Sequence, residues 1–275
     1  VYKRQAYYDA AIMASFGLTL ADRPVSVSGQ NMAGGNGNFL FGFDAGKTMT
    51  TADHNFAFGE GAMENADTTE YNFSFGQNAN KNITGTNGQN FAAGKYALEN
   101  STTGYMNIGI GPMAGQNNLA SHYNVFIGNK AGSKATGGSN VAIGGDSGGA
   151  SSSAGGASQW NVSVGSKAGR DITTGSNNTN IGYGAGWYAT ALTTGSSNTN
   201  IGYNARNTSP TVSNQFTLGS TNITNLRCND TSISSLSDER DKTDIQDTTL
   251  GLDFIKDVRP VAVSYTHLRA HETES

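Results

Sequence analysis

The sequence has 275 residues, a net charge of −4, 37 glycines and 14% charged residues. This polar but mostly uncharged composition is unlike that of an ordinary globular enzyme and argues against one large apolar core. No basic block provides the electrostatic footprint of a nucleic-acid partner, and no stretch has the roughly twenty apolar residues of a membrane helix. We therefore expect neither nucleic-acid binding nor membrane insertion, and the single cysteine, Cys228, excludes an intrachain disulfide framework.

Both ends of the chain resemble in-frame translations of sequencing adapters. They comprise residues 1–5 and 264–275, and we exclude them from the interpretation of function. His267 and His271, four residues apart, would otherwise suggest a zinc site. Once these two histidines are excluded, the sequence predicts no metal site and no cofactor. Residues 6–37 are expected to lead into the first repeat.

A short motif recurs through residues 38–219 with a period near seventeen. It consists of Asn, an apolar or small residue, any residue, an apolar residue, Gly, two variable residues and a small residue. The motif asparagines are Asn38, Asn55, Asn72, Asn90, Asn107, Asn124, Asn140, Asn161, Asn178 and Asn198. The small residue is alanine in every copy except one, where it is Ser147. A regularly placed small side chain predicts a tight inward corner.

This period is too short for helical repeats and fits one rung of a parallel β-solenoid. We expect an all-β shaft in which the two apolar residues between Asn and Gly point inward and the residue between them points outward. The asparagines are expected to stack at turns and to bond to backbone and to one another. Ten rungs would form a rod on the order of 50 Å long.

A single coil of this kind has a thin core, so several chains are expected to pack together. The N-x-x-I-G-x-x-A-G pattern resembles the head repeat of trimeric autotransporter adhesins, and phage tail fibres carry similar arrays. The resemblance covers about residues 38–219, with irregular spacing near 151–157 and after Ala205. It implies left-handed β-rolls that pack about a threefold axis as a homotrimer.

Residues 220–236 are expected to form a connecting β segment, and a concentrated charged run comes next at residues 237–245. The run and the later G-L-D-F-I and R-P sequences resemble the start of the intramolecular chaperone domain of endosialidases and tail fibres. The matching residues in the run are Ser237, Asp238, Arg240, Lys242 and Ile245. The resemblance implies a mainly α-helical domain over residues 237–263, truncated here, that assembles the trimer and then cuts itself off.

The resemblance assigns Ser237 as the nucleophile and Lys242 as its base, with the cut at Leu236, Ser237 or Asp238. A lysine can take the serine proton if burial lowers its pKa. A spacing of five requires an intervening turn or residues from neighbouring chains. In the alternative interpretation Ser237 caps a helix whose first turn carries Asp238 and Glu239, and both roles are compatible.

The sequence therefore predicts a structural and adhesive tail fibre located on the virion, with a host cell-surface glycan or protein as receptor. The expected chemistry is a single-turnover Ser–Lys self-cleavage in the complete domain, inactive in this fragment. One alternative is a trimeric adhesin of the bacterial cell surface. A second is a polysaccharide-degrading tailspike, which needs two carboxylates across a cleft. Acidic residues of the shaft are scattered over different rungs and single out no such pair. They include Asp44, Asp53, Glu60, Glu64 and Asp146.

Overall fold

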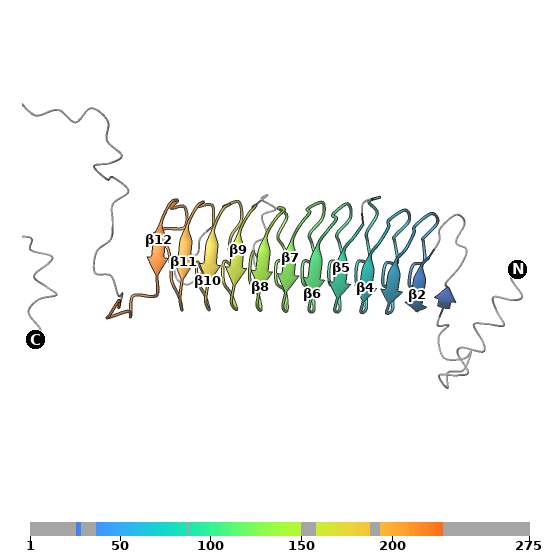
Figure 1. Ribbon diagram of the computed structural model, residues 1–275, viewed down its shortest axis with the longest axis horizontal. Helices are drawn as coiled ribbons and strands as arrows, with labels where there is room; N and C mark the ends of the chain where they lie inside the picture. The colour runs from blue at the N-terminus through green and yellow to red at the C-terminus, as the bar shows by residue number, and fades with distance from the viewer. Residues whose placement is uncertain (1–25, 29–36, 87, 150–157, 188–192, 228–275) are drawn as a thin grey trace, which may run out of the picture. The chain divides into compact units, whose positions relative to one another are not determined.

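The computed structural model describes residues 26–28, 37–86, 88–149, 158–187 and 193–227. The described residues form one twelve-stranded sheet, whose strands lie side by side in sequence order (Figure 1). The strands are β1 (Ser26–Ser28), β2 (Phe39–Gly42), β3 (Phe56–Phe58), β4 (Phe73–Phe75), β5 (Phe91–Ala93), β6 (Ile108–Ile110), β7 (Val125–Ile127), β8 (Val141–Ile143), β9 (Val162–Val164), β10 (Thr179–Ile181), β11 (Thr199–Ile201) and β12 (Phe216–Leu218).

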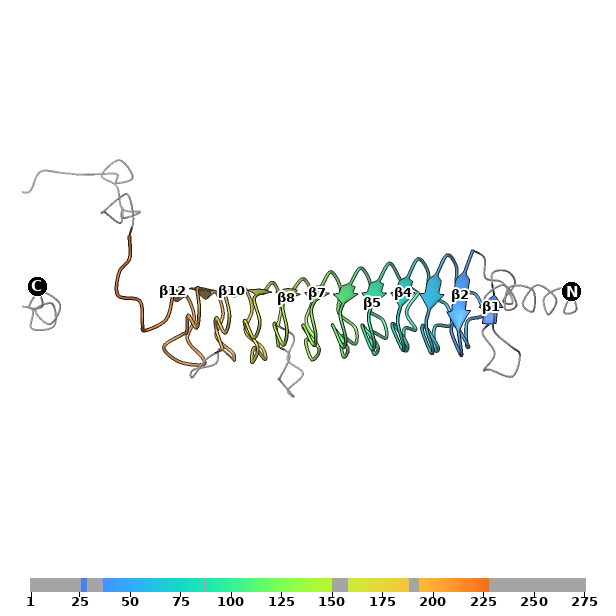
Figure 2. The same ribbon diagram turned by 90° about the horizontal axis from the view of Figure 1, so that it is seen from below.

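Strands β2 to β12 are parallel, and equivalent positions of the repeat lie opposite one another. Phe39 pairs with Phe56, for example, and Ile110 with Ile127. Each of these strands belongs to one rung of a coil, and Figure 2 shows the described parts of successive rungs following a similar outline. The expectation of an all-β parallel solenoid is confirmed for this part of the chain.

The expected orientation of the strand residues is wrong. From β2 to β11 the middle residue of the strand is enclosed, as with Leu40 and Phe126, while the apolar residues on either side of it are half-buried or exposed. In β12 the middle residue, Thr217, is half-buried. The motif asparagine sets this alternation, because its side chain also points into the coil and is buried. Since successive residues of a strand face opposite sides, an inward asparagine places the next residue outward and the middle residue inward.

The early phenylalanines are therefore on the outer face of the sheet and do not form the interior of the coil. Small side chains at the inward corner fill much of that interior, as predicted, and Ala62, Ala114 and Ser147 are all completely buried. One large ring is also enclosed, that of Phe126. A Cβ at Gly115 would lie 2.6 Å from this ring, and one at Gly132 would collide with it.

The motif glycine allows successive rungs to approach closely. Gly111 has a φ of 116° and Gly128 a φ of 129°, values that other residues rarely adopt. A Cβ at Gly111 would lie 2.8 Å from the carbonyl carbon of Gly128. Glycine is thus required at this point for both its backbone conformation and its lack of a side chain.

The N-terminal edge of the sheet carries a strand that the repeat did not predict. β1 pairs antiparallel with β2, with Val27 opposite Phe41. The pairing covers one edge of the sheet, which would otherwise present unpaired backbone groups. The chain divides into two compact units, residues 1–224 and 225–275, and every strand named above lies in the first. The expected helical segment at residues 237–263 lies outside the described residues.

Candidate functional site: the outer face of the sheet

The outer face of the sheet carries two parallel rows of mostly apolar side chains. The first row takes the first residue of each strand from β2 to β12: Phe39, Phe56, Phe73, Phe91, Ile108, Val125, Val141, Val162, Thr179, Thr199 and Phe216. The second takes the third residue: Phe41, Phe58, Phe75, Ala93, Ile110, Ile127, Ile143, Val164, Ile181, Ile201 and Leu218. We call these two rows together the outer apolar face.

Much of this face is open to solvent in the single chain. Phe39 is 42% exposed, Phe75 48% and Ile181 40%. Soluble monomers rarely expose a continuous apolar area of this extent, and larger patches mark surfaces of interaction. The face runs along the whole length of the coil, because the parallel register repeats it from strand to strand.

The rings of the first rungs are ordered by stacking on one another. In the first row, Phe56 lies 4.9 Å from Phe39 and 4.6 Å from Phe73, measured between ring centroids, with interplanar angles of 10° or less. In the second row, Phe58 stacks on Phe41 at 4.8 Å. Parallel pairing of identical positions brings each ring over the next, so these rings support one another within the single chain.

A continuous ladder of buried asparagines orients the outer apolar face. The Oδ1 atom of Asn55 accepts hydrogen bonds from the backbone nitrogen of Asn72 at 2.9 Å and from its Nδ2 at 3.0 Å. The Nδ2 of Asn55 donates to the carbonyl of Thr69 at 2.8 Å. The predicted stacking of asparagines is confirmed, and Gln215 replaces asparagine at the last rung, where its backbone nitrogen donates to Asn198.

A second asparagine ladder, six residues after the motif glycine, was not predicted. Asn65 donates to Asn82 at 2.7 Å, Asn82 to Asn100 at 2.8 Å, and Asn100 to Asn117 at 2.8 Å. The signal was present in the sequence, because these four asparagines recur with the same period as the motif. The ladder is short and only part-buried, so it supports the turns without defining the strand orientation.

Two acidic residues near the start of the coil, Asp44 and Glu64, take part in a chain of ion pairs. Lys47 lies 3.2 Å from Asp44 and 3.8 Å from Glu64, and Lys81 lies 3.0 Å from Glu64. The hydrogen bond from Lys81 to Glu64 raises the pKa of Lys81 above its ordinary value, although some burial opposes this. Because these ion pairs between rungs are partly exposed to solvent, each contributes only modestly to the stability of the coil.

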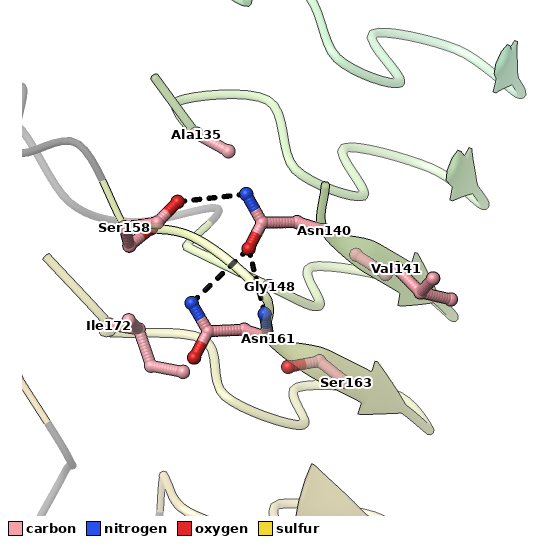
Figure 3. A pocket seen from close by; sticks show the side chains of 9 residues that line it. Ala135, Asn140, Val141, Gly148, Ser158, Asn161, Ser163 and Ile172 are labelled. Atoms are coloured by element: carbon pink, nitrogen blue, oxygen red, sulfur yellow. Dashed lines mark hydrogen bonds between the residues drawn. The ribbon is translucent and has the colours of Figure 1, made fainter. Parts of the chain in front are cut away.

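A small cavity lies between the rungs of β8 and β9. Figure 3 shows Asn140 accepting two hydrogen bonds from Asn161 and donating one to the carbonyl of Ser158, beside Ser163 and Ile172. The volume of the cavity is about 10 Å³, which is about the least that one water molecule needs. It is therefore too small to admit a substrate.

Ser237 and Lys242, and the cleavage positions Leu236, Ser237 and Asp238, lie outside the described residues, so their assignment stays a prediction. Within the described ranges, no three His, Cys, Asp or Glu side chains gather closely enough to hold a metal ion. The same ranges contain no helix long and apolar enough to cross a membrane.

The fold and its surface define the class of protein: a parallel β-solenoid with one apolar outer face. No family model, curated protein or solved structure matches this chain.

Proposed function

We propose that this chain is the shaft of a homotrimeric, adhesive fibre of the phage tail type, located on the virion. The observation that carries the proposal is the outer apolar face, which extends along the coil from β2 to β12 and has no cover within the described part of the chain. Three such faces turned toward a common axis would exclude water from both rows along the whole shaft. We propose a left-handed coil for the same assembly, by resemblance to adhesin heads.

The outer apolar face is aromatic near its N-terminal end and mainly aliphatic from β8 to β11. These two parts would place the sheet at different distances from the threefold axis of the proposed trimer. Phenylalanine occupies both rows at β2, β3 and β4, whereas Val, Ile and Thr predominate from β8 to β11. Bulkier side chains hold neighbouring sheets farther apart, so the proposed trimer is narrower at β8 to β11 than at β2 to β4. In this proposal the change of side-chain type along the coil concerns contacts between chains, because these residues face outward.

The C-terminal segment supplies assembly and release in this proposal. Residues 237–263 begin an intramolecular chaperone that aligns the three chains, and Ser237 with Lys242 cuts the complete domain away afterwards. A bacterial trimeric surface adhesin would use the same shaft but would carry a different C-terminal domain. A polysaccharide-degrading tailspike is less favoured, because Asp44 and Glu64 are engaged by the same lysine, Lys47.

The oligomeric state of the complete protein tests the proposal. Ile110→Asp combined with Ile127→Asp places six charges within the axis of a trimer, where burial would strongly disfavour them. We expect sedimentation to give three chains for the parent protein and unassembled or aggregated chains for the double variant. Leu119→Asp is a matched control, since Leu119 is 48% exposed but lies outside the strands. A folded, monodisperse monomer of the parent protein would contradict the proposal.

A further inference from the structure

The residues that lead into each strand form a second ordered surface. The residue before each motif asparagine has a positive φ, 57° at Tyr71 and 61° at Tyr123, and both of these side chains are 54% exposed. This conformation is uncommon for a residue with a Cβ. Hydrogen bonds between rungs maintain it, because the backbone nitrogen of Tyr71 donates to the carbonyl of Asp53 at 3.1 Å. We call the side chains one and two positions before each motif asparagine the corner row.

Two grooves interrupt the corner row where glycine stands two positions before the asparagine. The first, about 260 Å³, lies at Gly88 and is lined by Glu70, Tyr71, Gln89 and Tyr105, among others. The second, about 300 Å³, lies at Gly138 and is lined by residues that include His122, Tyr123, Ser139 and Gln159. At Gly88 a Cβ would collide with the carbonyl oxygen of Glu70, so close packing of the backbone requires glycine at this position.

Stacked rings support the walls of both grooves. Tyr71 stacks on His54 with 5.0 Å between ring centroids, and Tyr105 stacks on His122 at 4.0 Å. Tyr123 packs edge-on against Tyr105 at 5.5 Å, and their hydrogen bond raises the pKa of the Tyr105 hydroxyl. Because these rings are already held by neighbours, a ligand that stacks on them loses little by ordering them.

The chemistry of the walls indicates one class of ligand. Aromatic rings offer apolar faces, while the amides of Gln89 and Gln159 and the hydroxyl of Ser139 offer donors and acceptors at the rim. A sugar ring has this same combination, with C–H groups on its faces and hydroxyls around its edge. Among the described residues that line the two grooves there is no Lys or Arg, and Glu70 would repel an acidic group.

We propose that the two grooves of the corner row bind neutral saccharide units of a surface glycan. This inference rests on the adhesive part of the proposed function and identifies its ligand and its location. The groove glycines belong to rungs three apart along the coil, at Asn90 and Asn140, or roughly 14 Å at the usual spacing of β-strands. A linear oligosaccharide that lies along the coil reaches both grooves, so binding tightens with chain length.

The test uses the complete assembled protein and saturation-transfer NMR with defined tetrasaccharides. The neutral probes are tetramers of glucose, mannose, galactose and N-acetylglucosamine, and the acidic probe is tetragalacturonate. We expect transfer to at least one neutral tetramer and none to the acidic one. Tyr71→Ala and Tyr105→Ala should each weaken that binding on the order of tenfold, as truncation of an aromatic anchor does. Tyr203→Ala is the matched control, an aromatic that is 64% exposed outside the corner row, and should bind as the parent does.

Three results would overturn the proposal: no transfer to any neutral tetramer at millimolar concentration, tighter binding of tetragalacturonate, or equal losses in Tyr71→Ala and Tyr203→Ala. Sedimentation of the same samples separates this inference from the proposed assembly. If the protein is a trimer but binds none of the neutral probes, only the proposal of glycan-binding grooves is contradicted. If the protein is not a trimer, the proposed shaft assembly is contradicted. A Tyr71→Phe variant checks folding, because it preserves the stacked ring and should keep most of the affinity.

Discussion

The side-chain oxygen of Asn107 accepts two hydrogen bonds from Asn124, one from the backbone nitrogen at 3.0 Å and one from Nδ2 at 3.1 Å. Nδ2 of Asn107 in turn donates to the carbonyl of Ser121 at 2.8 Å. Both asparagines are fully buried, and the same relationship links most neighbouring rungs. One side chain therefore satisfies two backbone groups of the next rung, 14 and 17 residues later in the chain.

Asn107→Ala should destabilise the shaft strongly. The substitution leaves the backbone nitrogen of Asn124 and the carbonyl of Ser121 without these partners in a buried position, at a cost of about 1–3 kcal/mol for each unsatisfied group. Asn100→Ala is the control, since Asn100 belongs to the part-buried second ladder. Guanidinium unfolding of the assembled protein, monitored by circular dichroism, should give a much larger loss for Asn107→Ala. Equal midpoints would show that the buried ladder has no special role.

Gly128→Ala should prevent normal stacking of the rungs. Gly128 has a φ of 129°, and an added Cβ would lie 2.7 Å from the carbonyl oxygen of Gly144. Gly145→Ala is the control, since it makes the same chemical change at a glycine with room for a side chain. A Cβ at Gly145 would lie no closer than 3.9 Å to any neighbouring atom. We expect poor yield of folded protein for the first variant and a nearly unchanged thermal midpoint for the second. A Gly128→Ala protein with the parent midpoint would refute the close-approach argument.

Phe126→Ala should lower the free energy of unfolding by about 3–5 kcal/mol, because it removes a large enclosed side chain from a coil with few others. Phe126 is completely buried, and glycines at positions 115 and 132 make room for its ring. Phe126→Leu retains most of the volume and should lose distinctly less stability. Chemical denaturation of all three proteins, at equal oligomeric state, measures the difference. A loss for alanine no greater than that for leucine would contradict the enclosed position.

Ser237→Ala and Lys242→Ala should each leave the complete parent protein uncut but still trimeric, because assembly and cleavage are separate tasks. Without the lysine to accept its proton, the serine hydroxyl is a weak nucleophile. Intact-mass measurement of the complete protein, combined with sedimentation, tests both parts. The 275-residue chain by itself should stay uncut under the same conditions. A cut that persists in Ser237→Ala would remove the catalytic role and leave the helix-cap interpretation.

The sequence by itself determined the repeat and the parallel register of its strands. The sequence alone shows the period near seventeen and, within each period, the asparagine, the glycine and the small corner residue. Each of these residues occupies its expected place in a rung. Regular spacing is sufficient for this, because equivalent residues of a solenoid must stack on one another. The grooves at Gly88 and Gly138 were not predicted, since they depend on which side chains flank each glycine in neighbouring rungs.

Only the tertiary structure decided which side of each strand faces inward. Alternation along a strand permits two opposite assignments, and a one-residue change exchanges the two faces completely. The apolar pair of each motif favoured burial within one chain, but the asparagine before the pair satisfies buried backbone groups and must point inward. Its hydrogen bonds are specific in direction, whereas apolar side chains can be covered by any neighbour. The asparagine therefore occupies the interior, and Phe39, Ile110 and their equivalents form the outer apolar face.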